Sequence, residues 1–246
     1  MTTRRKLPHN PARATIAPLP SLSSIQEKER ELDDLRQYPE EEFARIIADV
    51  GFHCTCCTRC CTQEFNGHVF LLDEDVPALR ECDPDALIPA PGYEFCDQAG
   101  MFYVSGFALR TDETGACRFL ERGRCAHYLQ RPLVCRCYPY MLHREPDAHG
   151  TIDWRQISGL DEHGEYNVPI DPIECLRIAR EAKRYEIASL EQEIAFLDLI
   201  RSHFQRRGLR HVRRIYDLQM RKLREGEPVE VMVFYQGRFE RCQAVY

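Results

Sequence analysis

Residues 51–61 read GFHCTCCTRCC and place five cysteines in eleven positions. A single cysteine is usually a small buried hydrophobic residue. Five neighbouring thiols gain nothing from packing, however, and free thiols are open to oxidation. The chain has thirteen cysteines among 246 residues, an odd number that does not fit a closed set of disulfides. We therefore expect this stretch to bind metal, since metal ligation uses many thiols at once.

The spacing Cys54-x2-Cys57-x2-Cys60-Cys61 limits how these thiols can share one ion. On a straight helix, Cys54 and Cys61 would lie about 10.5 Å apart along the axis. This is too far for four sulfurs that must each lie ~2.3 Å from one zinc ion. The stretch is therefore either a tight non-helical knuckle or a source of ligands for two centres. The side chains of adjacent Cys60 and Cys61 diverge, which favours two centres.

Two centres need ligands from elsewhere, and the later cysteines provide them. Four early and four later cysteines give eight thiolates, enough for two four-thiolate sites. Such sites are negatively charged, so Arg131 and Arg136 are expected to donate to the sulfurs. Zinc and iron–sulfur clusters both fit the spacing, and the all-cysteine donor set in an irregular segment slightly favours an iron–sulfur cluster over Zn2+. The predicted ligands are Cys54, Cys57, Cys60, Cys61, Cys117, Cys125, Cys135 and Cys175.

Together, the two cysteine segments resemble the YkgJ-type cysteine-cluster family, which carries a CxxCxxCC signature and is described as zinc- or iron-chelating. The resemblance covers roughly residues 43–180 and implies a metal-chelating domain. The first segment matches at Phe52-x-Cys54-x2-Cys57-x2-Cys60-Cys61. The second matches at Gly115-x-Cys117-x-Phe119-Leu120, Cys125, and Tyr128-x2-Arg131-Pro132-x2-Cys135-Arg136-x-Tyr138-Pro139.

The chain departs from this family at two positions. Thr58 stands where members often have glycine, and Cys175 lacks the Cys-Pro-Gly context common in relatives. Flagellin lysine methylases contain a similar cysteine pattern, so the resemblance also implies a cluster-dependent modifying enzyme as an alternative. Nothing outside the two segments resembles a catalytic domain of known type.

The remaining cysteines and nearby histidines have several possible roles. Cys137 fits a core position or a place near the site, and Cys56 is an extra thiol in the cluster. A Cys137 nucleophile with a histidine base is conceivable, but the sequence offers no oxyanion-hole signature, and catalysis stays an open question. Three cysteines fit ordinary core positions: Cys82, Cys96 and Cys242. Three histidines could replace a thiolate: His53, His127 and His143.

Composition and charge narrow the class of protein. No run approaches the ~20 apolar residues of a membrane span, and the N-terminus lacks the apolar core of a secretory signal. We expect a cytoplasmic protein without a membrane partner. Residues 21–176 carry a net charge of −15 and residues 177–224 carry +7. The late basic segment could bind a protein partner or dock on the acidic middle, whereas a pI of about 5.9 argues against nucleic acid.

The periodicity of apolar residues predicts an α+β fold. We expect a small irregular cysteine-rich core with short strands, flanked by helices, a long C-terminal helix pair and a terminal hairpin that turns at Gln236-Gly237. Ser23 or Ser24 should cap the first helix. The predicted helices cover residues 24–36, 40–50, 73–81, 172–207 and 209–224. The predicted strands before the hairpin cover residues 68–72, 101–110, 116–120 and 150–157.

The expected organisation follows this pattern. Its five parts are a flexible tail (1–22), N-terminal helices (23–50), a cysteine-cluster metal-binding domain (51–175), a C-terminal helical segment (176–225) and the hairpin (226–246). The leading functional hypothesis is a metal-binding protein with a redox role or a role accessory to an enzyme. The alternatives are the modifying enzyme and a zinc-scaffolded protein-interaction module, in which zinc would contribute ~10–16 kcal/mol to folding.

Overall fold

The computed structural model describes residues 19–140, 142–146, 152–156 and 163–245. Within them the chain has an α+β fold built around one long helix, α6 (Pro172–Arg207), as the periodicity predicts. The side chain of Asp171 accepts a hydrogen bond from the N–H of Ile173 at the start of α6. Gly208, with a φ of 62°, ends the helix. The predicted flexible tail falls mostly outside the described residues.

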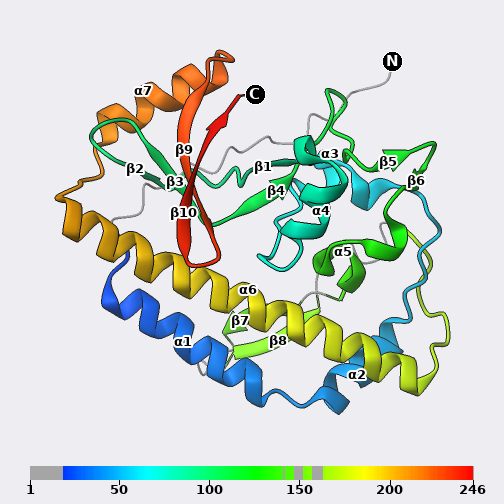
Figure 1. The fold of residues 1–246 in the computed structure, drawn as a ribbon. Helices are drawn as coiled ribbons and strands as arrows, with labels where there is room; N and C mark the ends of the chain where they lie inside the picture. The colour runs from blue at the N-terminus through cyan, green and yellow to red at the C-terminus, as the bar shows by residue number, and fades with distance from the viewer. Residues whose placement is uncertain (1–18, 141, 147–151, 157–162, 246) are drawn as a thin grey trace, which may run out of the picture.

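Two N-terminal helices, α1 (Leu22–Gln37) and α2 (Glu40–Val50), run along one side of α6 (Figure 1). Their buried residues Leu35, Phe43 and Ile47 join Leu190 of α6 in one apolar cluster. Ser21, rather than Ser23 or Ser24, caps α1, because its side chain accepts a hydrogen bond from the N–H of Ser24. Both helices otherwise match the prediction within two residues.

A four-stranded sheet packs on the other side of α6 near its C-terminal end (Figure 1). Its order is β10 (Arg238–Ala244), β9 (Val229–Tyr235), β3 (Phe102–Val104) and β2 (Phe95–Cys96). The β9–β10 hairpin turns at Gln236-Gly237, as predicted. Since β3 pairs in parallel with β9, the terminal hairpin shares a sheet with strands from the cysteine-rich part of the chain.

Short elements surround the cysteine segments. Antiparallel pairs join β1 (Leu87–Pro89) to β4 (Phe107–Leu109), β5 (Leu120–Glu121) to β6 (Arg124–Cys125), and β7 (Leu142–Pro146) to β8 (Ile152–Gln156). The short helices are α3 (Gln63–Asn66), α4 (Val76–Cys82) and α5 (Leu133–Cys137). Single 3-10 turns are η1 (Arg59–Cys61), η2 (Pro84–Ala86) and η3 (Tyr128–Gln130).

Three predicted strands differ from the structure. The stretch 68–72 forms only an isolated bridge, between Phe70 and Ala108. The stretch 101–110 is divided into β3 and β4, which lie in different sheets. A side chain of α6 explains the break, because the amide of Gln192 donates to the carbonyl oxygens of Ser105 and Leu71, each at 3.3 Å. The stretch 116–120 contributes bridges and the start of β5 rather than a strand of its own.

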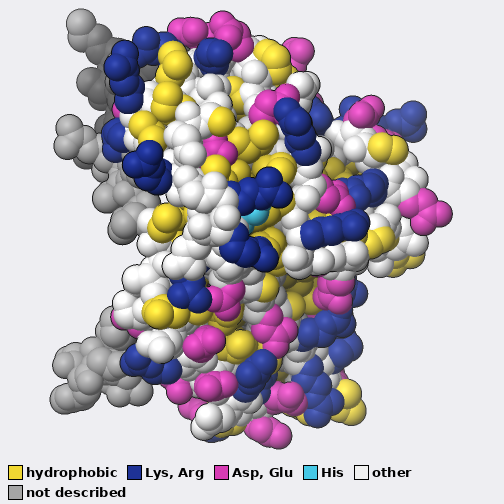
Figure 2. Space-filling model, turned by 60° about the vertical axis from the view of Figure 1, so that its left-hand side comes forward, with side chains coloured by type: hydrophobic (Ala, Val, Ile, Leu, Met, Phe, Trp, Pro, Cys, Tyr) yellow, Lys and Arg dark blue, Asp and Glu magenta, His cyan; other side chains and the backbone are white. Residues whose placement is uncertain are grey.

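The basic C-terminal helices are α7 (Arg213–Arg224) and the end of α6. Figure 2 brings this side of the molecule forward and shows Lys and Arg side chains interspersed with acidic ones. Part of the basic charge is neutralised within the helices, since Arg201 pairs with Asp198 at 3.3 Å and Arg213 pairs with Asp217 at 3.1 Å. In the described part of the chain, no helix is both long enough and apolar enough to span a membrane.

Candidate metal centre

The loop that carries the early cysteines begins at Gly51, the left-handed end of α2. A β-carbon at this position would overlap the backbone carbonyl oxygen of Val168, so only glycine fits without displacing the chain. His53 exchanges two backbone hydrogen bonds with Glu165, at 2.8 and 3.0 Å. The N–H of Phe52 donates to the Tyr140 hydroxyl at 2.8 Å. The loop therefore leaves the helical core from a fixed position.

The cysteine stretch itself is not helical until η1. Cys56 and Thr58 both have left-handed backbones, with φ of 55° and 66°. These two residues turn the chain sharply and make the stretch the tight knuckle that the thiol spacing allows. Glycine is the residue that this conformation favours, and Thr58 adopts it with a full side chain.

The later cysteines reach this loop through backbone pairing. The N–H of Cys117 donates to the carbonyl oxygen of Cys61 at 2.8 Å, and the N–H of Gln63 donates to Gly115 at 2.7 Å. Cys125 lies in β6, which pairs with the strand that follows Cys117. Cys135 lies in α5, whose first N–H, that of Leu133, donates to Asp75 at 3.1 Å. Thiols that are remote in sequence are thus brought to one place.

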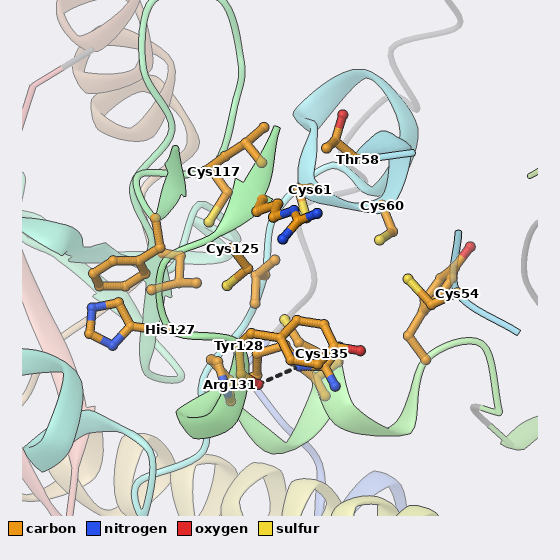
Figure 3. Close-up of a pocket in the computed structure, with 18 of the residues that line it drawn as sticks. Cys54, Thr58, Cys60, Cys61, Cys117, Cys125, His127, Tyr128, Arg131 and Cys135 are labelled. Carbon is orange, nitrogen blue, oxygen red and sulfur yellow. Dashed lines mark hydrogen bonds between the residues drawn. The ribbon is translucent and has the colours of Figure 1, made fainter. Parts of the chain in front are cut away.

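These thiols line one cavity of about 680 Å³ (Figure 3). In this view Cys54 and Cys60 lie on one side of the cavity, and Cys117 and Cys125 lie on the other. Six of the eight predicted ligands line its wall, together with the extra Cys56. The seven lining cysteines are Cys54, Cys56, Cys60, Cys61, Cys117, Cys125 and Cys135.

Four of these thiols form a group that we call the inner set: Cys61, Cys117, Cys125 and Cys135. In every pair of thiols within this set, negative charge on one member raises the pKa of the other. Burial is the largest cause at three of them: it raises the pKa of Cys117 to about 11, and it raises those of Cys125 and Cys135 as well. Four thiolates could coexist there only with a cation to offset their repulsion.

The adjacent thiols of Cys60 and Cys61 interact directly. The Cys61 thiol donates a hydrogen bond to Cys60, which lowers the pKa of Cys60 and raises that of Cys61 far above its ordinary value. Cys60 also interacts electrostatically with Cys54 and Cys57 of its own loop and with Cys135 of the inner set. Cys57 itself is exposed and does not line the cavity.

Arg131 places a positive charge at the cavity. Its guanidinium lies 3.8 Å from the centre of the Tyr128 ring, and its Nε donates to the Tyr128 carbonyl oxygen at 3.0 Å. Burial raises the pKa values of Cys54, Cys125 and Cys135, and the charge of Arg131 opposes this effect at each of them. Arg136 was expected to donate to sulfur as well, but it forms an ion pair with Glu181 at 3.6 Å.

Cys175, like Cys57, is a predicted ligand that does not line the cavity. It is buried near the start of α6, in the same apolar cluster as Cys137. Its thiol lies 3.8 Å from the carbonyl oxygen of Ile170. Cys96 is fully buried, as expected for a core cysteine, in a different apolar cluster that includes Phe102 and Val231. Cys242 packs against that second cluster. Cys82 was expected in the core and is instead exposed.

The histidines near the cysteines have different surroundings. His127 lines the cavity, and its Nε2 lies 3.0 Å from the sulfur of Cys82. His53 does not line the cavity, and the side chain of His143 lies outside the described residues. His68, which the sequence did not single out, also lines the cavity. Burial lowers the pKa of His68, and its Nδ1 is buried without a hydrogen-bond partner among the described residues.

The thiols that line the cavity are ligands that thiophilic metals prefer. Soft thiolates suit zinc and iron–sulfur clusters, and a nearby guanidinium offsets part of their negative charge. Within the described ranges, no three His, Cys, Asp or Glu side chains are already gathered around a point that would hold an ion. Comparison with protein-family models, curated proteins and solved structures found no match to this chain.

Proposed function

We propose that this protein binds an iron–sulfur cluster or zinc at the thiol-lined cavity, with the inner set as ligands. The observation that carries the proposal is the backbone pairing of Cys61 with Cys117, which holds early and late thiols at the same cavity. The inner set comes from four separate segments, and four thiols that line one cavity are a donor set that soft metals prefer. The resemblance to the YkgJ-type family likewise implies metal binding by early and later cysteines together.

The size of the cavity favours a cluster over a single ion. One zinc ion with four thiolates needs its sulfurs ~2.3 Å from the metal. A cavity of about 680 Å³ has room for much more than that, and an iron–sulfur cluster adds several irons and inorganic sulfides. When bound, such a cluster supplies one-electron chemistry, so the role would be electron transfer or assistance to a modifying enzyme.

A second candidate is a cluster-dependent modifying enzyme. The same cavity volume lies within the ~300–1,000 Å³ of small-molecule sites, so a substrate could lie beside the metal. A cytoplasmic location fits both candidates, because a reducing compartment keeps the thiols free to bind metal. The basic ends of α6 and α7 are the surface that we assign to a protein partner.

Metal analysis tests the proposal. The protein would be purified without oxygen, and iron, zinc and acid-labile sulfide would be measured per chain. We expect a brown protein with iron and labile sulfide in similar amounts. A colourless protein with zinc alone would replace the cluster by a zinc centre and favour the interaction module. A protein with neither metal would refute the proposal.

A further inference from the structure

The mouth of the thiol-lined cavity carries exposed apolar and basic side chains that metal binding does not use. We call this group the rim: Phe70, Arg122, Arg124, Tyr128 and Leu129. We propose that the rim docks an acidic segment of a protein partner, with a large apolar side chain of that segment at the mouth of the cavity. The rim is separate from the basic ends of α6 and α7. The inference goes beyond the proposed metal binding, because it rests on side chains around the cavity and not on the thiols.

Three large apolar side chains are exposed at the rim. Phe70 and Tyr128 both line the cavity and are 49% and 45% exposed, so they lie where the cavity opens to solvent. Leu129, the next residue of η3, is 93% exposed and does not line the cavity. Single exposed apolar residues are common, but several beside one cavity are typical of a binding surface.

Basic side chains accompany these apolar ones. Residues 118–136 contain five arginines and one acidic residue, so their net charge is +4, within a region whose net charge is −15. Arg122 and Arg124 belong to the β5–β6 hairpin, and their side chains have neither an ion pair nor a hydrogen bond with another residue in the described part of the chain. The other three arginines have partners: Arg118 pairs with Asp83, Arg136 pairs with Glu181, and Arg131 stacks on Tyr128.

The combination of charge and apolar surface indicates the kind of partner. Figure 3 shows Tyr128 and Arg131 on the same side of the cavity, so the two kinds of side chain face one opening. A small anion inside the cavity would leave Leu129 in water, because Leu129 projects outside it. A nucleic acid would be repelled by the chain's net charge of −6. An acidic protein segment with an apolar side chain satisfies both features, since carboxylates can face the two free arginines while the apolar group covers Leu129 and Tyr128.

Fluorescence anisotropy with labelled synthetic peptides tests this surface. The probe is a short peptide of glutamate, leucine and phenylalanine, and two matched peptides carry lysine in place of glutamate or serine in place of the apolar residues. The acidic apolar peptide should bind more tightly than either matched peptide. A rise in salt from about 0.1 M to about 1 M shortens the Debye length from ~10 Å to ~3 Å and should weaken this binding.

Variants of the rim locate the binding site. Arg122→Glu and Arg124→Glu combined in one chain should weaken binding of the acidic apolar peptide at least ~10-fold, because charge repulsion replaces attraction. Leu129→Ser should weaken it about tenfold and should leave the metal content at the wild-type level. The matched controls are Arg30→Glu and Ile173→Ser, changed at exposed residues that do not line the cavity, and both should bind the peptide as the wild type does.

Several results overturn the inference. These are no binding of the acidic apolar peptide, equal binding of the lysine peptide, tighter binding of a labelled single-stranded oligonucleotide, or equal losses in the rim variants and the controls. A dimer in light scattering that Leu129→Ser disperses would assign the rim to a second copy of this chain instead. Circular dichroism would show that each variant keeps its fold. Peptide binding by a protein without metal would refute the proposed function alone, and metal without peptide binding would refute the docking surface alone.

Discussion

The N–H of Cys117 donates a 2.8 Å hydrogen bond to the carbonyl oxygen of Cys61. A bridge between Thr62 and Ala116 continues this antiparallel contact away from the cavity. Backbone hydrogen bonds, rather than the thiols themselves, therefore hold the two cysteine segments together. Because the ligands are brought close before any metal arrives, less conformational entropy is lost when the metal binds.

Replacement of Gly51 by alanine should destabilise the protein and displace the cysteine loop. The left-handed backbone alone costs a non-glycine residue ~1–3 kcal/mol. At Gly51 the new β-carbon also overlaps the carbonyl oxygen of Val168, which should add ~1–3 kcal/mol for the forced backbone shift. Gly208→Ala is the matched control, because Gly208 is also left-handed and has nothing within 4 Å of the new β-carbon.

Urea denaturation of both alanine variants measures this difference, and metal content reports the position of the loop. Gly51→Ala should lose more stability and more metal than Gly208→Ala. Equal losses in the two variants would mean that the contact with Val168 does not position the loop.

Replacement of Arg131 by glutamine should weaken metal retention. The guanidinium is the charge that opposes the effect of burial on the pKa values of Cys54, Cys125 and Cys135. Loss of such a supporting group typically lowers metal affinity ~10–100-fold. Competition with a chelator of known affinity measures the change. Arg136→Gln is the control, because it removes the ion pair with Glu181 instead, and its metal affinity should stay close to that of the wild type. Equal losses of affinity in the two variants would contradict this role of Arg131.

The stability of the protein should fall at alkaline pH, in part through Cys96. Burial, followed by the charge of Asp97, raises the pKa of this thiol to about 12. In the unfolded chain an ordinary thiol has a pKa of about 8.5. The folded state therefore favours the neutral thiol, and this stabilisation is complete below the unfolded pKa and is lost as pH rises towards the folded pKa.

Urea denaturation between about pH 8 and pH 11 measures this dependence. The fall in stability should be shallower in Cys96→Ala than in the wild type, while a Cys82→Ala control, changed at an exposed thiol, should keep the wild-type slope. Because the variants are compared at equal metal content, the pH dependence of metal binding cancels. A slope in Cys96→Ala as steep as that of the wild type would rule out this role of the buried thiol.

Local signals in the sequence were enough to predict much of the fold. The apolar spacing and the acidic first turn define α2, and Gly208 defines the end of α6. The turn residues Gln236-Gly237 define the hairpin. The break between β3 and β4 could not be predicted in this way, because it depends on Gln192, a residue of α6 that is remote in sequence. Local propensity carries no information on such a contact.

The candidate site, too, could be predicted from the sequence only in part. Clustered spacing identified Cys54, Cys60 and Cys61, because so many thiols in one stretch have few other uses. The later lining cysteines were predicted only as the further ligands that two centres would need. Spacing could not show that Cys56 faces Cys54, since that orientation comes from left-handed backbones at positions without glycine. It also could not show that Cys175 lies in the helical core, which depends on how α6 packs against α2 and α5.

The central claim is that cysteines from remote segments hold one common centre. Its most direct test is the metal content of four single variants, Cys61→Ser, Cys117→Ser, Cys125→Ser and Cys135→Ser, purified without oxygen beside the wild type. Each variant should lose metal from this common centre, and the four losses should be of similar size. Full metal content in the variants of Cys117, Cys125 and Cys135 would show that the early cysteines bind metal without the later ones, and would contradict the account.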